Sequence, residues 1–225
     1  MLFSIIFCFL ISGVLTLQSE TNDHALKKHF EAHRQNDWNA FESLTAQGEW
    51  HLGPDMYLVD YFIKKPNKWS AIAKEGKQQL ISNQLFAGQI GLAPNNSQAL
   101  EPAEAIALSY VWSFGSPLYS IADQLQRKEE LQVDQIPCHW YQYQKETMTY
   151  DFFISQKDHL FYKVVVTNEE GLVQSSTTIR QYRQFGPYQM PSQVTIKTEH
   201  LEYLMVFTDY VIGDYVDDRI FLPGK

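Results

Sequence analysis

The second half of the chain is a nearly unbroken series of segments with the composition of β-strands. From residue 130 onward, β-branched and aromatic residues are enriched, and turn residues such as Asp158, Gly171 and Gly186 separate the segments. Many consecutive strands joined by short turns favour an antiparallel sheet, because parallel pairing would need long crossover connections. The predicted strands of this half are residues 130–133, 138–144, 147–155, 160–167, 173–185, 193–198 and 203–212.

A β-hairpin with a basic tip is predicted in the first half of the chain. Residues 56–65 are rich in aromatic and β-branched side chains, and Pro66 ends this strand because proline has no N–H for a strand ladder. Asn67 suits a turn, and residues 68–74 form the returning strand. Two short strands are predicted after the hairpin, at residues 79–82 and 85–92, so the sheet has about ten or eleven strands in total.

Helices are predicted before the strands and within the strand order. Residues 24–35 have a helical pattern with Asp23 as its N-cap, and residues 101–114 have apolar side chains at helical spacing behind an N-terminal proline. A second short helix is predicted at residues 118–125. No strand is predicted at residues 41–50, where the helical pattern fades. The fold class is therefore α+β.

A sheet of ten or eleven strands has to curl, and its concave face has to be covered. The helical segments at residues 101–125 are available for this because they interrupt the strand order. If they fill the concavity, the interior is an ordinary core. If they only lie across its mouth, the interior is an apolar chamber with a lid. The same residues line both, so the sequence pattern leaves the two alternatives open.

The ends of the chain and its composition indicate one exported domain. Residues 1–19 are interpreted as a signal peptide, because residues 1–17 are uncharged and apolar but too few to span a bilayer. The alternative is a retained membrane anchor, since no Lys or Arg precedes the apolar run. Residues 20–225 then form a single domain without repeats or linkers. Cys8 belongs to the apolar run, so Cys138 is left without a partner for a disulfide. The sequon at residues 95–97 is interpreted as a loop.

Charge and motifs exclude several functions. The net charge of -8 argues against nucleic-acid binding and gives no electrostatic reason for binding to an anionic membrane surface. His29 and His33 are four residues apart on a helix, but no third metal ligand accompanies them, so a solvated helix face is expected. Asp217 and Asp218 are expected in a turn, and Cys138 is expected as a small buried residue. No catalytic motif, metal site or cofactor is predicted, so the chain is not expected to be an enzyme.

Several stretches resemble one known family. They are residues 26–32 followed by Trp38, Phe41, Leu44 and Gly48; residues 63–69; residues 178–183 followed by Gly186, Met190 and Pro191; and residues 217–223. Together they resemble the LolA-like outer-membrane lipoprotein-sorting proteins, a family of periplasmic lipoprotein carriers. The resemblance implies an incomplete β-barrel whose helical lid closes an apolar cavity for acyl chains. It also implies a periplasmic location, and as partners lipoprotein acyl chains or another lipid together with transport components of the inner and outer membranes.

The resemblance assigns candidate site residues. Lys65 stands where the family usually has an arginine that fastens the lid by hydrogen bonds to lid carbonyls, and lysine lacks the planar fork of that arginine. Trp69 matches a large apolar position at the cavity mouth. The candidates for lining the cavity are Tyr61, Ile63, Trp69, Ile106, Tyr110, Phe114, Phe152, Ile154, Met205 and Phe207. The second hypothesis is a binding or scaffold module of the same fold, whose own side chains fill the chamber and which acts through protein–protein contacts.

Overall fold

The computed structural model describes residues 23–65, 68–74, 83–87, 91–93, 98–99, 107–111 and 113–221. Several of the sequence predictions lie outside these residues: the signal peptide, the turn at residues 66–67, the strand at 79–82, the sequon at 95–97, the start of the helix at 101–106 and with it the cavity candidate Ile106. Within them, no helix combines the length and the apolar composition that crossing a membrane requires.

The described strands form one sheet in which every pair of neighbours is antiparallel. In spatial order its strands are β6 (Gln98–Ala99), β5 (Gly91–Ala93), β4 (Asn83–Ala87), β3 (Lys68–Lys74), β2 (Asp55–Lys64), β1 (Ser43–Leu52), β14 (Glu202–Ile212), β13 (Tyr188–Thr198), β12 (Val173–Phe185), β11 (Phe161–Thr167), β10 (Met148–Ser155), β9 (Ile136–Lys145) and β7 (Gln126–Arg127), and β8 (Leu131–Val133) also pairs with β9. Ten of these fourteen strands have five residues or more. The predicted curved, incomplete barrel is confirmed: within the described residues the sheet ends at β6 and β7 and does not close on itself.

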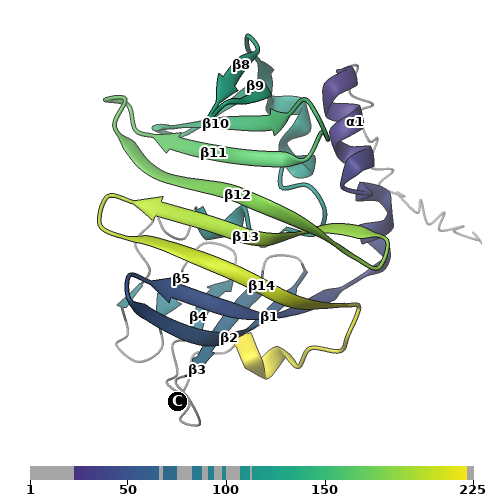
Figure 1. Cartoon of the computed structure of the whole chain (residues 1–225), viewed down its shortest axis with the longest axis vertical. Coiled ribbons are helices and arrows are strands. Elements are labelled where there is room, and N and C mark those ends of the chain that lie inside the picture. The colour runs from purple at the N-terminus through teal and green to yellow at the C-terminus, as the bar shows by residue number, and fades with distance from the viewer. Residues whose placement is uncertain are drawn as a thin grey trace, which may run out of the picture.

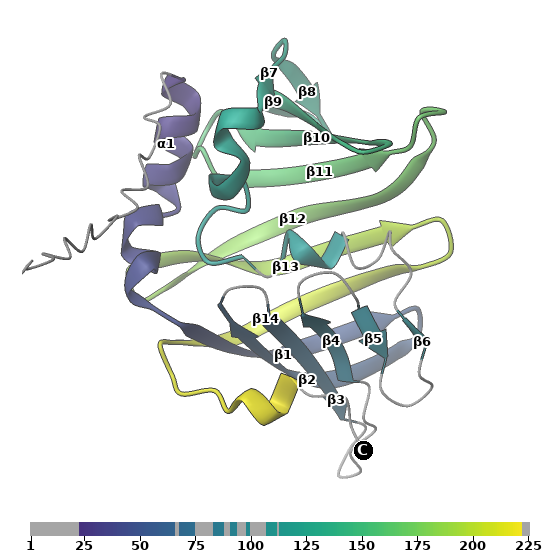
Figure 2. The same ribbon diagram turned by 180° about the vertical axis from the view of Figure 1, so that it is seen from behind.

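The sheet curls around a concave face. In Figure 1, β1 and β2 lie in front while β3, β4 and β5 turn behind them, and Figure 2 shows the concavity from the other side. The pairing of β12 with β13 is locally irregular, because its register shifts twice just before Tyr182 pairs with Pro191. A proline and a register shift of this kind increase the local bend of a strand pair.

The described helical segments are short. They are α1 (His24–Ala32), the 3₁₀ helices η1 (Gln35–Ala40), η2 (Tyr119–Gln124) and η3 (Asp218–Phe221), and a helical piece at residues 107–109. Asp23 caps α1 as predicted, because its Oδ1 accepts the N–H groups of Ala25 at 2.9 Å and Leu26 at 3.2 Å.

Two predictions of secondary structure are corrected. Residues 43–52 form β1, a central strand between β2 and β14, although no strand was predicted there. Their alternation was missed because Gly48 interrupts it: the register against β14 shifts at this residue, where a Cβ would lie 2.2 Å from the carbonyl oxygen of Val206. The helix predicted to reach Phe114 ends at Ser109. Side chains of other elements donate hydrogen bonds to the carbonyl oxygens of Ala107 and Phe114.

One main hydrophobic cluster fills the concave side of the sheet. It contains buried side chains from β1, β2, β3, β9, β10, β11, β12, β13 and β14, and from α1 and η1. A smaller cluster around Cys138, Phe153 and Tyr162 lies apart from it. The concave side is therefore apolar, and whatever covers it determines the room that is left.

Candidate functional site

Residues 107–118 cover the concave face, and we call their described part, residues 107–111 and 113–118, the covering segment. Figure 2 shows its helical piece lying across the inner side of the sheet near β13. Thr177 of β12 holds the start of the segment by donating from Oγ1 to the carbonyl oxygen of Ala107 at 2.7 Å. The ring of Tyr110 then packs against Phe152 of β10, with the two ring centroids 5.4 Å apart.

The N-terminal helices hold the other end of the covering segment. Gln35 donates from Nε2 to the carbonyl oxygen of Phe114 at 3.3 Å and accepts the N–H of Ser116 on Oε1 at 2.7 Å. The hydroxyl of Ser116 lies 2.6 Å from Nε2 of His29 on α1. Among the described residues, side-chain hydrogen bonds connect this segment to the rest of the fold, whereas neighbouring strands are joined by backbone ladders.

Lys65, the predicted latch, lies at the junction of three elements. It directly follows β2, its Nζ donates to the carbonyl oxygen of Trp38 in η1 at 2.7 Å, and the same Nζ lies 5.3 Å from the centroid of the Phe114 ring. A cation at this distance from a ring face is attracted to it. The lysine therefore contacts the covering segment through a ring and the N-terminal region through a carbonyl.

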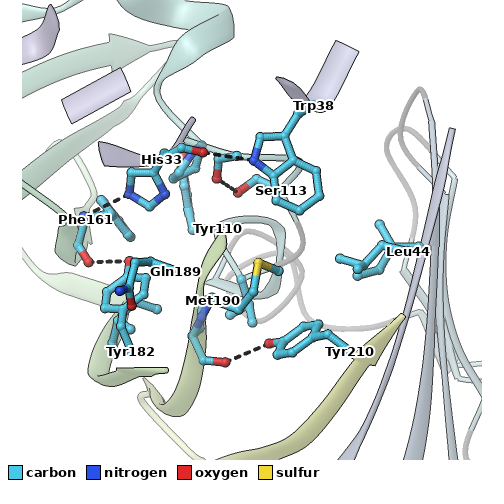
Figure 3. Close-up of a pocket in the computed structure, with 16 residues that line it drawn as sticks. His33, Trp38, Leu44, Tyr110, Ser113, Phe161, Tyr182, Gln189, Met190 and Tyr210 are labelled. Atoms are coloured by element: carbon cyan, nitrogen blue, oxygen red, sulfur yellow. Dashed lines mark hydrogen bonds between the residues drawn. The ribbon is translucent and has the colours of Figure 1, made fainter. Parts of the chain in front are cut away.

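A pocket lies between the covering segment, the N-terminal helices and the concave face (Figure 3). Tyr110, Val111, Ser113, Gly115 and Pro117 line it from the covering segment. The other lining residues are His33, Trp38, Leu44, Ile63, Phe161, Ile179, Tyr182, Gln189, Met190, Pro191 and Tyr210. None of these described lining residues is Asp, Glu, Lys or Arg.

The pocket is small and electrically neutral in this closed form. Its cavity volume is about 20 Å³, which holds about one water molecule and leaves no room for an acyl chain. Burial raises the pKa of Tyr110, Tyr182 and Tyr210 above the ordinary value, so these phenols stay uncharged at physiological pH. A lining in which apolar residues outnumber polar ones and no Asp, Glu, Lys or Arg occurs disfavours charged ligands.

The structure brings the described candidate residues together in one cluster. Tyr61, Ile63 and Trp69 are at most 4% exposed, as are Phe152, Ile154, Met205 and Phe207, and all belong to the main hydrophobic cluster. Tyr110 and Phe114 are half-buried and pack against it. Of these candidates only Ile63 and Tyr110 line the pocket itself. The others lie deeper or further along the face: Tyr61, for example, packs on Phe207 with the ring centroids 5.1 Å apart.

The sequence did not single out most of the pocket residues. Trp38 is 2% exposed, its Nε1 donates to the carbonyl oxygen of His33 at 2.9 Å, and its ring lies 4.5 Å from that of Tyr188. Met190 and Tyr210 both line the pocket and lie side by side in Figure 3, and Tyr210 donates from its hydroxyl to the carbonyl oxygen of Pro191 at 2.7 Å. Trp38, Met190 and Pro191 were among the residues that carried the family resemblance, so that resemblance was the available signal.

The prediction that His29 and His33 lie on a solvated helix face is wrong. They are 0% and 7% exposed, and their rings contact each other with centroids 4.6 Å apart. The helical face was misassigned because its partners, Ser116 and Phe161, come from distant parts of the chain. No group of three or more metal-ligating side chains occurs among the described residues, so these histidines have no third ligand there.

The close pair of Ser116 and His29 does not have the surroundings of a catalytic dyad. Ser116 is 4% exposed and does not line the pocket, and its Oγ accepts the N–H of Leu118 at 3.0 Å. The other nitrogen of His29 faces the carbonyl oxygen of His159 at 2.7 Å, where a catalytic triad places a carboxylate. The pair therefore has the geometry of a structural bridge.

The remaining side chains considered in the sequence have structural roles. Cys138 is 0% exposed, and burial raises the pKa of its thiol to about 11, so it is a poor nucleophile. Asp217 binds Arg219 at 2.5 Å, and Asp218 binds Lys64 at 3.1 Å and Lys68 at 3.0 Å. The two aspartates thus start η3 and attach it to the hairpin of β2 and β3.

Comparison with solved structures confirms the predicted fold. A DUF1329 family protein from Desulfovibrio piger ATCC 29098 superposes with a TM-score of 0.57 at 9% identity, covering 88% of this chain and 97% of that one. A LolA superfamily protein from Nitrosomonas europaea gives 0.54 at 11% identity, covering 88% and 96%. An outer-membrane lipoprotein-sorting protein domain from Vibrio parahaemolyticus gives 0.56 at 9% identity, covering 88% and 97%.

The chain therefore has the fold of LolA-like lipoprotein-sorting proteins. No family model matches the sequence, and no curated protein matches it. At identities of 9–11% the similarity is one of fold alone.

Proposed function

We propose that this protein is an exported, non-enzymatic carrier that binds acyl chains of a lipoprotein or another lipid, in outer-membrane lipoprotein sorting. The observation that carries the proposal is the covering segment. It closes an apolar, uncharged concave face with half-buried rings and a few hydrogen bonds, and not with a strand ladder. The LolA-like fold of the sheet supports the same function.

The energetics of an acyl chain explain why such a carrier needs a movable cover. Burying each methylene contributes about 0.8 kcal/mol, so a sixteen-carbon chain gains about 12 kcal/mol by leaving water. The closed cavity of about 20 Å³ cannot hold it. Loading therefore requires the covering segment to move away, and the acyl chain replaces side chains such as Tyr110 and Phe114 against the sheet. Lys65 then acts as the latch that keeps the cover in place when no cargo is bound.

The second candidate function is a binding or scaffold module that carries no lipid. The small cavity favours it, because in the closed form the described side chains fill nearly all of the room beneath the covering segment. A module of this kind would use its outer surface for protein–protein contacts and would never open.

Lipid binding distinguishes the two functions. Purified protein is analysed by native mass spectrometry and by extraction for bound lipid, and the delipidated protein is titrated with a fluorescent sixteen-carbon fatty acid. A carrier shows saturable binding that an unlabelled fatty acid displaces. If no lipid co-purifies and the probe shows no saturable binding, the scaffold function replaces the carrier.

A matched pair of variants tests whether the concave face is the binding surface. Ile63→Trp fills the pocket and is expected to weaken binding of the probe at least tenfold, since it removes room that the acyl chain needs. Leu58→Trp introduces the same side chain on the same strand at a 51% exposed position outside the cluster, and should leave binding unchanged. Equal binding by both variants would contradict the assignment of the site. Thermal melts show that each variant is folded.

The remaining parts of the proposal concern the compartment and the partners. Residues 1–19 serve as the signal peptide, and residues 20–225 function as one domain in the periplasm. Its partners are then the acyl chains and the membrane components that deliver and receive them.

A further inference from the structure

The covering segment is held at one end by a histidine that connects three elements. Nδ1 of His29 lies 2.7 Å from the carbonyl oxygen of His159, in the turn between β10 and β11, and Nε2 lies 2.6 Å from Oγ of Ser116. Because a carbonyl oxygen only accepts, Nδ1 must carry the hydrogen. In the neutral ring Nε2 then accepts the hydroxyl hydrogen of Ser116, whose oxygen in turn accepts the N–H of Leu118.

A second histidine, one turn further along, makes a contact that only an unprotonated Nε2 allows. Nε2 of His33 accepts the backbone N–H of Phe161, the first residue of β11, at 3.2 Å. The carbonyl oxygen of Phe161 accepts from the hydroxyl of Tyr182 at 2.7 Å, so this residue is held from both sides (Figure 3). A proton on Nε2 of His33 would place N–H against N–H and break the contact.

The charges around this pair do not favour a proton. His159 opposes a proton on His29, and His29 opposes a proton on His33, whose ring also contacts that of Tyr182. His24, Lys28 and His139 act on His159 and not directly on the pair. Asp158 is an acidic group that acts on His159 and Tyr182. Burial lowers the pKa of His29 from 6.5 to about 4, and burial together with the charge of His29 lowers the pKa of His33 well below 6.5.

We propose that His29 and His33 form an acid-sensitive latch that holds the covering segment closed when both rings are neutral and releases it when they are protonated. The proposal rests on the movement of the covering segment that the proposed function requires. It does not depend on the cargo, because every bond of the latch is within the protein.

The direction of the pH dependence follows from the two states. In the closed state the histidines titrate below their exposed value of 6.5, so the open state binds more protons. The closed state is therefore fully favoured above pH 6.5 and loses stability as the pH falls from 6.5 toward 4. Each histidine shifts the balance by about tenfold per pH unit in this range. Between pH 7.5 and 5.5 the open fraction rises about tenfold through His29 and about a hundredfold through both.

Hydrogen exchange without lipid tests the latch. Exchange of the amides of Ser116, Leu118 and Phe161 is measured at pH 7.5 and 5.5 and corrected for the intrinsic pH dependence of exchange. We expect opening of these amides to increase ten- to a hundredfold at pH 5.5, while central amides of β1 and β14 change little.

Variants assign the effect to the two rings. The double variant His29→Gln and His33→Gln has no group to protonate at these positions, and its opening should change less than threefold between the two pH values. His24→Gln, on the exposed side of the same helix, should keep the full wild-type response. If the double variant does not fold, the histidines of the wild-type protein are titrated by NMR. A ring of His29 or His33 that titrates near pH 6.5 while the covering segment stays closed overturns the proposal. Hydrogen exchange that does not depend on pH overturns it as well. If the pH response is absent but the protein binds lipid, the carrier function is still supported. If the pH response is present but the protein does not bind lipid, the latch is still supported.

Discussion

Replacing Lys65 by methionine tests the second attachment of the covering segment. The substitution keeps most of the apolar stem but removes the ammonium group, which donates to the carbonyl oxygen of Trp38 at 2.7 Å and lies 5.3 Å from the ring of Phe114. A hydrogen bond from a charged group contributes about 1.5–3 kcal/mol, and a cation–ring contact at a partly exposed site about 0.5–1 kcal/mol. Only the ring contact is made to the covering segment, so we expect its closed state to lose about 0.5–1 kcal/mol, while the lost hydrogen bond weakens the attachment of η1.

This loss corresponds to about a two- to fivefold increase in opening of the covering segment. The measurement is hydrogen exchange of the amides of Ser116 and Leu118, together with the dissociation rate of a bound fluorescent fatty acid, which should rise in the same proportion. Lys65→Glu should have a larger effect, because a carboxylate beside a carbonyl oxygen is repelled.

Lys64→Met is the matched control, since it removes the neighbouring ammonium group, whose partners are the carbonyl oxygen of Val216 and the carboxylate of Asp218, both 3.1 Å away. It should speed exchange around η3 and leave the covering segment unchanged. If Lys65→Met exchanges at the wild-type rate at Ser116, or if the control opens the covering segment equally, the latch role of Lys65 is refuted.

Two further predictions concern the rest of the site. Gly115→Ala is expected to lower the melting temperature by several degrees and to open the covering segment. Gly115 has a φ of +80°, and an added Cβ would lie 2.4 Å from Oε1 of Gln35 and 2.7 Å from Trp38. A variant with unchanged melting temperature and unchanged hydrogen exchange would contradict this packing. Cys138 should react with a thiol reagent at pH 8 at least a hundredfold more slowly in the folded protein than in denaturant, and comparable rates would show that its burial is not maintained.

The strands of the second half could be predicted because their signals are local. Residues 173–185 were predicted as one strand and form β12 with the same bounds, and the turn at Gly186 follows it. The strand at residues 43–52 was missed because its bulge at Gly48 depends on pairing with β14, about 160 residues away in the chain. Alternation within one segment does not reveal an irregularity that its partner causes.

The candidate site was only partly predictable. Ile63 and Tyr110 were expected near a cavity and do line the pocket, because the apolar pattern indicated which residues face inward. The contacts of His33 with Phe161 and of Gln35 with Ser116 were not expected, since each joins elements that are far apart in sequence. A polar side chain on a helix looks solvent-exposed in the sequence until its distant partner is known.

The amino-acid sequence by itself determined an antiparallel sheet that must curl and an interrupting segment available to cover it, because strand alternation, turn residues and prolines act within a few neighbouring residues. Only the tertiary structure decided how much room remains beneath that segment and which polar groups hold it there. The physical reason is that cavity volume and buried hydrogen bonds depend on the curvature of the whole sheet and on contacts between distant segments, where shifts of a fraction of an ångström decide whether a side chain fills the space or leaves it open.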